Sequence, residues 1–346
     1  MEVAEWRKCD HMKGLLNNKS WVWLGAFLVL IFLGPVISSN LDAYYFSIVM
    51  YAGVNIVLAV SLNLVNGFTG QFSIGHAGFM SVGGYVSAFL SMLLMQNHLA
   101  LMTGPWSHLV FFGLLILGGV AAAAIGYIVG LPSLKLKGDY LAIVTLGFGE
   151  IIRVCILNID SVGGARGMFG IPALTSFSWV YSWVVFVLFF AWRMLKSSHG
   201  RSLLSVREDE IAATAMGVNT TKAKVKAFIF ASFFAGVAGG LYAHFLRYLN
   251  PQTFDFNKSF EIVIMVVLGG MGSLSGSVVA AILLTVLKEA LRPLQEITQV
   301  DLRMVIYSLM LIILMLTKPN GLFGHREIFD FFSKKKDKSP RRIVEA

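Results

Sequence analysis

Apolar runs long enough to cross a bilayer recur along the whole of this 346-residue chain. A helix of about 20 apolar residues crosses the roughly 30 Å of hydrocarbon in a membrane. Charged residues make up only 14% of the chain, whereas a soluble protein carries roughly 25%. We therefore predict an all-α polytopic membrane protein. About ten transmembrane helices are expected, at residues 21–38, 44–64, 75–95, 109–130, 139–157, 177–195, 225–246, 259–271, 275–291 and 304–317. Because the eighth and ninth runs are short, counts of nine and eleven remain open.

Lys and Arg gather in four segments that ten spans place on one side of the membrane. Cationic loops are retained in the cytoplasm when a protein inserts, so both termini are expected there. The predicted organisation is a cytoplasmic N-terminal segment at 1–20, a transmembrane domain at 21–317 and a basic cytoplasmic tail at 318–346. The transmembrane domain contains a cytoplasmic loop at 196–224. The net charge of +9 then indicates contact with anionic lipid rather than with nucleic acid.

Ten spans divide into two sets of five, and an odd number per set gives the second set the opposite orientation. Such an inverted-topology repeat is a common plan among transporters. The sequence supports it only through a glycine- and serine-rich interruption in each half. The charge bias has exceptions, since Lys258 and Lys288 fall on the expected outer side.

Polar residues interrupt the second and third apolar runs between residues 61 and 90. An unpaired polar group in hydrocarbon costs several kcal/mol, so these side chains must face protein or a water-filled path. One interpretation is hydrogen bonding between tightly packed helices, and the other is a broken helix that lines a path. Metal binding is disfavoured because His76 has no second ligand near it at a suitable spacing. The candidates for lining a path are Asn66, Gln71, Ser73 and His76.

A second interruption, at residues 266–281, alternates glycine with serine. It lacks the Lys of a phosphate-binding loop, so it favours a re-entrant turn or a tight helix crossing. Ser273 and Ser275 are weaker candidates for the path. Glu150 and Arg153 share a helix face and predict an ion pair. No grouping of catalytic residues indicates an enzyme.

The longest markedly polar stretch between apolar runs is "GRSLLSVREDEIAATAMGVNTTKAKVKAF", residues 200–228. It predicts a short helix over 203–216 that ends at Gly217 in a positive-φ conformation. Asn219 or Thr220 would cap the next helix, whose first lysines would anchor it at the inner surface. A helix lying on lipid is the alternative, although its acidic residues would be repelled by an anionic leaflet. Docking on another protein fits better, through Arg207, Glu208, Asp209, Glu210, Ala212, Ala213 and Gly217.

Within this stretch, "EIAATAMG" resembles the coupling segment of ABC-importer permeases, whose loose pattern is Glu-Ala-Ala, three residues, then Gly. Ala212, Ala213 and Gly217 keep the spacing, but Ile211 holds the first position and Glu210 precedes it. Nearly all of residues 40–325 resembles the LivM-type permease of branched-chain amino acid ABC transporters. The segments that carry this resemblance are "GFTGQFSIGHAGFMSVGGYVSAFL", "LKGDYLAIVTLGFGEIIR", "GRSLLSVREDEIAATAMGVNTTKAKVKAFIFASFFAGVAGGLY" and "IVIMVVLGGMGSLSGSVVAA".

The resemblance implies a type II ABC-importer-like permease in the bacterial inner membrane. It further implies a LivH-type partner permease, two ATP-binding cassette ATPase subunits, and a periplasmic binding protein that delivers leucine, isoleucine or valine. ATP and Mg²⁺ would bind to the ATPase subunits, and this chain would hold no cofactor or metal. ATP-driven closure would push on residues 203–217 and open the path alternately to either side. Urea and short-chain amide permeases look alike and remain an alternative, and a stand-alone secondary transporter is a less favoured one.

Overall fold

The computed structural model describes residues 40–97, 106–134 and 138–292 without a gap, together with residues 34, 104 and 136 and short pieces between 305 and 324. Within these residues, six helices are long and apolar enough to span a membrane. They overlap the predicted spans from the second to the seventh, so those six predictions are confirmed. The six helices are α2 (Ala43–Asn66), α3 (His76–Asn97), α5 (Ser107–Ser133), α6 (Asp139–Leu157), α7 (Phe177–Lys196) and α10 (Thr220–Leu246).

Four further α-helices in the described residues are shorter: α8 (Ser198–Glu208), α9 (Glu210–Ala215), α11 (Phe256–Gly269) and α12 (Leu274–Ala290). The last two coincide with the predicted spans at 259–271 and 275–291. The spans expected at 21–38 and 304–317 lie largely outside the described residues, as do the segment 1–20 and most of the tail. The chain is therefore a mostly helical, multi-pass membrane protein, while the count of ten and the five-plus-five repeat stay predictions.

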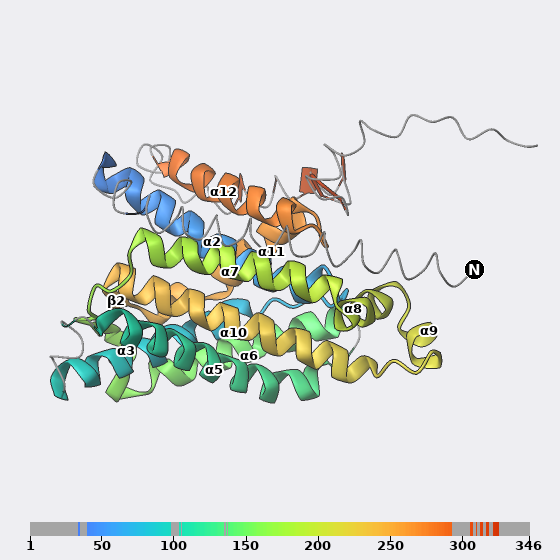
Figure 1. Ribbon diagram of the computed structural model, residues 1–346, viewed down its shortest axis with the longest axis horizontal. Coiled ribbons are helices and arrows are strands. Elements are labelled where there is room, and N and C mark those ends of the chain that lie inside the picture. The colour runs from blue at the N-terminus through green and yellow to red at the C-terminus, as the bar shows by residue number, and fades with distance from the viewer. Residues whose placement is uncertain are drawn as a thin grey trace, which may run out of the picture.

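Helices α2 and α10 form the interior of the bundle. In the membrane-length window of α2, 83% of the residues are buried, against 28% in α6 and in α7. Figure 1 shows α10 between α7 and the α3–α5 pair, with α12 along the opposite edge of the bundle. The polar residues of α2 consequently lie inside the protein, where each hydrogen-bonding group needs a protein or water partner.

Glycines bring the backbones of α3, α5 and α10 into contact. A Cβ atom on Gly83 would collide with the backbone of Gly236, and one on Gly239 would collide with the carbonyl of Met80. A Cβ on Gly118 would lie 2.7 Å from the carbonyl oxygen of Gly83. Small residues let membrane helices approach this closely and gain dispersion energy along their length. We call Gly83, Gly118, Gly236 and Gly239 the glycine seam.

The connections at the end of the bundle remote from α8 form a short antiparallel ladder. Strand β1 (Met168–Phe169) follows the 3₁₀ turns η1 (Asp160–Val162) and η2 (Gly164–Arg166), and pairs with β2 (Tyr248–Leu249). Tyr85, halfway along α3, donates to the carbonyl oxygen of Leu249 at 3.3 Å. Another 3₁₀ turn, η3 (Pro251–Phe254), leads into α11. This connection therefore dips into the bundle before α11 begins.

Candidate functional site

The loop of residues 67–75 breaks the path of the chain between α2 and α3. Asn66, the last residue of α2, holds this loop folded back. Its Oδ1 accepts from the amide of Ser73 at 3.1 Å and its Nδ2 donates to the carbonyl of Ser73 at 3.3 Å. Gly70 adopts a φ of 69°, a conformation that glycine reaches without strain. The interruption predicted from sequence is thus a real loop between two membrane-length helices.

His76 opens α3 and is buried. Its Nε2 lies 2.8 Å from the hydroxyl of Ser61 on α2. Gln71 differs from the other three candidates of the first interruption, because its Nε2 is buried and has no hydrogen-bond partner among the described residues. Buried donors are nearly always paired, so an unpaired one is available to bind a ligand or water. Asn66, Ser73 and His76 shape the loop, whereas Gln71 alone among the four has a buried side-chain atom without a partner in the described part of the chain.

The second interruption is the turn between α11 and α12. Gly270 and Gly272 have φ values of 109° and 96°, and the Ser273 hydroxyl caps α12 by accepting from the amide of Gly276 at 3.1 Å. Ser273 is fully buried, and its hydroxyl lies 3.3 Å from that of Ser275. A Cβ on Gly276 would collide with the backbone of Gly269. Of the two alternatives expected here, a re-entrant turn and a tight helix crossing, the close approach of Gly269 and Gly276 supports the crossing.

Asn63 of α2 joins the two interruptions, and sequence analysis missed it as a site residue. Its Nδ2 donates to the carbonyl of Ser273 and to the hydroxyl of Ser277, each at 2.9 Å. Its Oδ1 accepts from the amide of Gly272, also at 2.9 Å. Asn66 lies one turn further along α2 and binds the first loop. The same helix end therefore holds both polar interruptions, although more than 200 residues of sequence separate them.

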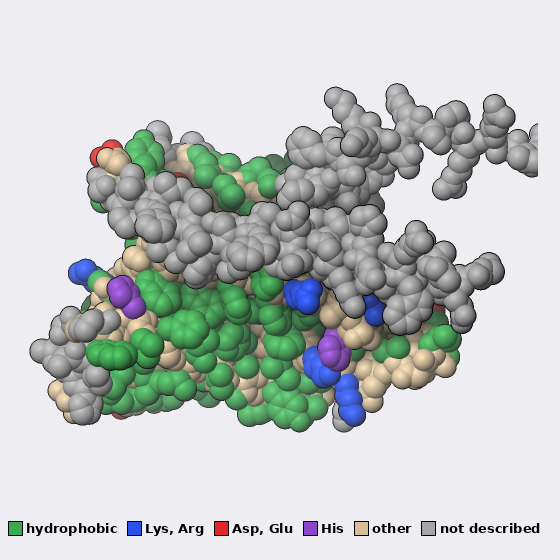
Figure 2. All heavy atoms as spheres, viewed as in Figure 1, with side chains coloured by type: hydrophobic (Ala, Val, Ile, Leu, Met, Phe, Trp, Pro, Cys, Tyr) green, Lys and Arg blue, Asp and Glu red, His purple; other side chains and the backbone are tan. Residues whose placement is uncertain are grey.

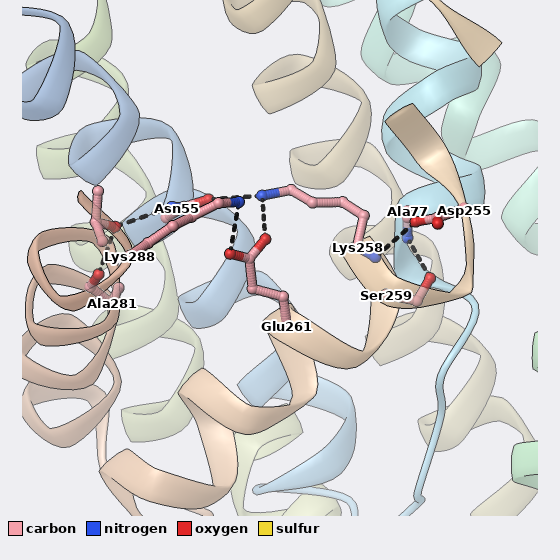
Figure 3. Close-up of polar contacts among 9 residues, drawn as sticks. Asn55, Ala77, Asp255, Lys258, Ser259, Glu261, Ala281 and Lys288 are labelled. Carbon is pink, nitrogen blue, oxygen red and sulfur yellow. Dashed lines mark hydrogen bonds and ion pairs between the residues drawn. The ribbon is translucent and has the colours of Figure 1, made fainter. Parts of the chain in front are cut away.

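A buried charge cluster lies at the level of the middle of α2 (Figure 3). Glu261 of α11 accepts from the Nζ atoms of Lys258 at 2.9 Å and Lys288 at 3.0 Å. Asn55 accepts from Lys258 at 3.3 Å and donates to the hydroxyl of Thr285 at 2.9 Å. The Glu261 side chain is 9% exposed and that of Lys288 is 38% exposed. The cluster ties α2, α11 and α12 together with two cations around one anion.

Sequence analysis counted Lys258 and Lys288 only as exceptions to the charge bias on the expected outer side of the membrane, and it did not pair them with Glu261. The Lys258–Glu261 spacing of three residues was a visible signal. The pair Glu150–Arg153 has the same spacing, and its predicted ion pair is confirmed at 2.7 Å. The pairing of Lys288 with Glu261 could not be predicted from spacing, because the two residues meet only through the packing of α12 on α11.

The polar stretch after α7 folds into two helices, where sequence analysis expected one over residues 203–216. Asp209 separates them, because its extended backbone ends α8 and its carboxylate accepts from the amides of Ile211 and Ala212 to cap α9. Gly217 ends α9 with a φ of 83°, as predicted. Asn219 caps α10 by accepting from the amide of Lys222 at 2.9 Å, also as predicted. We call residues 198–219 the elbow.

Charged residues of the elbow attach it to the bundle. Glu210 pairs with Lys224 of α10 at 2.7 Å, and the Lys224 side chain is buried. Lys224 therefore does not anchor α10 at the membrane surface, contrary to the expectation for the first lysines of that helix. Arg207 pairs with Glu208 at 2.6 Å, and its Nη1 donates to the carbonyl of Gly67 at 3.3 Å. The elbow thus touches the loop that carries Gln71.

The tip of the elbow presents apolar side chains to the outside. Ile211 is 77% exposed and Met216 is 84% exposed. Ala212 is exposed beside them, whereas Ala213 is buried against the bundle. A helix that is fixed by its charged residues and exposes two large apolar ones has the composition of a protein docking surface.

Comparisons with known proteins give a consistent set of relatives. The family model described as branched-chain amino acid transport system / permease component matches residues 44–315. The high-affinity branched-chain amino acid transport system permease protein LivM of Salmonella typhimurium (strain LT2) is 35% identical over 302 residues, which are 77% of this chain and 67% of that protein. The LivM protein of Escherichia coli (strain K12) is 34% identical over 339 residues, or 88% and 75% of the two chains. The LivH permease protein of Escherichia coli (strain K12) is 24% identical over 310 residues, or 82% and 97%. No solved structure gives a significant match.

Proposed function

Because the chain belongs to the permease family of branched-chain amino acid transport systems, we propose that it is a pore-forming subunit of an ATP-driven ABC importer for leucine, isoleucine and valine. The names of its LivM relatives support the substrate class. Its similarity to LivH proteins as well as to LivM proteins supports pairing with a second, LivH-type permease. Two ATPase subunits would bind ATP and Mg²⁺, and a periplasmic protein would deliver the amino acid. The complex would lie in the inner membrane, with both termini of this chain in the cytoplasm.

The observation that carries the proposal is the contact between the elbow and the loop of residues 67–75. Arg207 reaches the carbonyl of Gly67 from α8, and its Cγ lies 3.1 Å from where a Cβ on Gly70 would be. A displacement of the elbow by an ATPase therefore reaches this loop without passing through a flexible segment. Membrane transporters commonly build their substrate path where helices are interrupted.

The polar residues then have distinct proposed roles. Gln71 contacts substrate or the water that accompanies it, because its buried amide has a donor without a partner in the described chain. Asn66, Ser73 and His76 hold the loop in place through the contacts described above. Ser273 and Ser275 shape the opposing turn, which Asn63 joins to the same end of α2. The loop and the turn would form one wall of the path.

Docking of the elbow on an ATPase is tested by Ala212→Trp in the transporter reconstituted with its partner permease, two ATPase subunits and binding protein. The larger side chain blocks entry of α9 into a groove, so uptake should fall at least about tenfold, which corresponds to a loss of about 1.4 kcal/mol of coupling. ATPase activity should also lose its stimulation by loaded binding protein. The matched control is Ala43→Trp, an exposed alanine at the start of α2. Trp is favoured at a membrane interface, so this control should transport normally.

Three outcomes would contradict the proposal. Wild-type uptake by Ala212→Trp would show that α9 lies on lipid and does not dock. Uptake by the chain in vesicles without any ATPase, driven by a proton or sodium gradient, would favour a secondary transporter. Competition for uptake by urea or short-chain amides, but not by branched-chain amino acids, would support an ABC importer with a different substrate class.

A further inference from the structure

A groove opens where the end of α7, the start of α8 and the start of α10 meet. Its volume is about 750 Å³. Aromatic side chains of α7 and α10 form one wall, and residues 217–219 of the elbow line the groove as well. The aromatic residues are Phe186, Phe189, Phe190 and Phe230. The groove therefore connects an apolar wall at membrane depth to the turn that ends the elbow.

Three exposed cations, Arg193, Lys222 and Lys226, also line the groove. Within the described part of the chain, no carboxylate lies within 4.0 Å of their nitrogens. Lys224 differs, because it lies between the two lysines in sequence but is buried against Glu210. Figure 2 shows Lys and Arg side chains gathered at this end of the bundle, beside a broad apolar surface.

The position of the lysines is unfavourable in the absence of an anion. Lys222 and Lys226 are four residues apart on one helix, where like charges repel. Lys222 also lies in the first turn of α10, where the positive end of the helix dipole repels cations. An anion bound between them would relieve both effects. The aromatic wall indicates that this anion carries a long apolar part.

We propose that the groove binds an anionic phospholipid, with the phosphate beside Lys222, Lys226 and Arg193 and an acyl chain along the phenylalanines. Basic pockets between membrane helices bind anionic headgroups, and aromatic residues favour the region just below them. The assignment to the inner leaflet rests on the proposed cytoplasmic position of the elbow. Binding itself goes beyond the transport function. A lipid seated here would also brace residues 217–219 and steady the elbow.

The first test is native mass spectrometry of the whole transporter, titrated with phosphatidylglycerol or phosphatidylcholine. The wild-type complex should retain phosphatidylglycerol and not phosphatidylcholine. A Lys222→Gln/Lys226→Gln variant should bind phosphatidylglycerol about 30-fold more weakly, since each surface cation contributes roughly fivefold. The control variant Lys196→Gln/Arg201→Gln removes two cations from the same end of the bundle without touching the groove, and it should retain the lipid.

The second variant, Ala223→Phe, keeps every cation and fills the groove. It should lose phosphatidylglycerol while eluting as the assembled complex. Wild-type lipid retention by Ala223→Phe would overturn the proposal, because the cations would then act as a surface charge only. An equal loss in the control pair would overturn it for the same reason. Loss of a partner subunit from the lysine variant, with lipid retained, would show that the cations bind protein. None of these measurements depends on the transported substrate.

Discussion

The turn before α10 and the turn before α12 are built alike but are packed differently. Each contains a glycine at positive φ followed by a polar N-cap: Gly217 and Asn219 in the elbow, Gly272 and Ser273 in the α11–α12 turn. A Cβ on Gly217 would meet nothing within 4 Å. Near the other turn, the backbones of Gly269 and Gly276 already touch. Similar turn residues therefore make both connections, but only the second turn lies against a tightly packed pair of helix backbones.

The difference separates the proposed docking surface from a joint that holds the bundle. The elbow buries Leu203, Val206 and Ala213, makes two charged contacts, Glu210–Lys224 and Arg207 to Gly67, and exposes apolar side chains at its tip. The α11–α12 turn is held by three hydrogen bonds from Asn63 and by the Glu261 cluster behind it. We expect substitutions in the second region to affect folding and those in the first to affect coupling.

The largest effect on stability is expected for Glu261→Leu. It leaves the part-buried Lys258 and the more exposed Lys288 without their buried anion, and breaking a buried pair costs up to about 3–5 kcal/mol. The thermal stability of the purified complex would fall sharply. The control is Glu150→Gln, which breaks a part-exposed pair and should change stability by less than about 1 kcal/mol. A triple variant with Lys258→Met and Lys288→Met added should recover most of the loss. Equal stability of the two single variants would show that the Glu261 cluster contributes no more to stability than a part-exposed ion pair.

An intermediate effect is expected for Gly276→Ala. The added methyl group collides with the backbone of Gly269, and overpacking of this kind costs about 1–3 kcal/mol. Gly113→Ala in α5 is the matched control, because its Cβ would meet nothing within 4 Å. Alanine is the better helix former, so the control should stabilise the protein by roughly 0.5–1 kcal/mol. Thermal unfolding in one detergent compares the two, and a stabilised Gly276→Ala protein would show that the crossing is loose.

The smallest effect on stability is expected for Met216→Ser at the tip of the elbow. The side chain is almost fully exposed, so the change in unfolding free energy should stay within about 0.5 kcal/mol. Copurification of the ATPase subunits should nevertheless weaken several-fold, because an exposed apolar contact of a docking surface is lost. A Met216→Ser protein that is clearly destabilised, with ATPase binding intact, would show that this residue of the elbow contributes to folding and not to docking.

The features predictable from sequence are those that short segments determine. Gly217 and Asn219 stand next to the helix ends they terminate and cap, and the loop between α2 and α3 follows from clustered glycines. The break at Asp209 was equally local: an Asp followed by Glu-Ile-Ala is an N-cap signal, but a continuous apolar face obscured it. The six long helices follow from their hydropathy alone.

Long-range contacts account for what could not be predicted. Asn63 resembles any polar residue of an apolar run until α11 and α12 pack against it. Lys224 looks like one of three surface lysines until Glu210, 14 residues earlier, pairs with it. Neither pairing has a sequence signal of its own, because the geometry that creates it comes from the packing of separate helices.

The glycine seam has a consequence for how this chain can diverge. Gly83, Gly118 and Gly236 lie on three different helices, and each occupies space that another would need for a single methyl group. A mutation at Gly83 has no compensating change within reach, since the atoms nearest to its added methyl group are backbone atoms of Gly236. Single substitutions at these positions are therefore expected to be selected against, even though none of these glycines bears a functional group. We expect descendants of this chain to vary their lipid-facing residues widely and to keep these three sites.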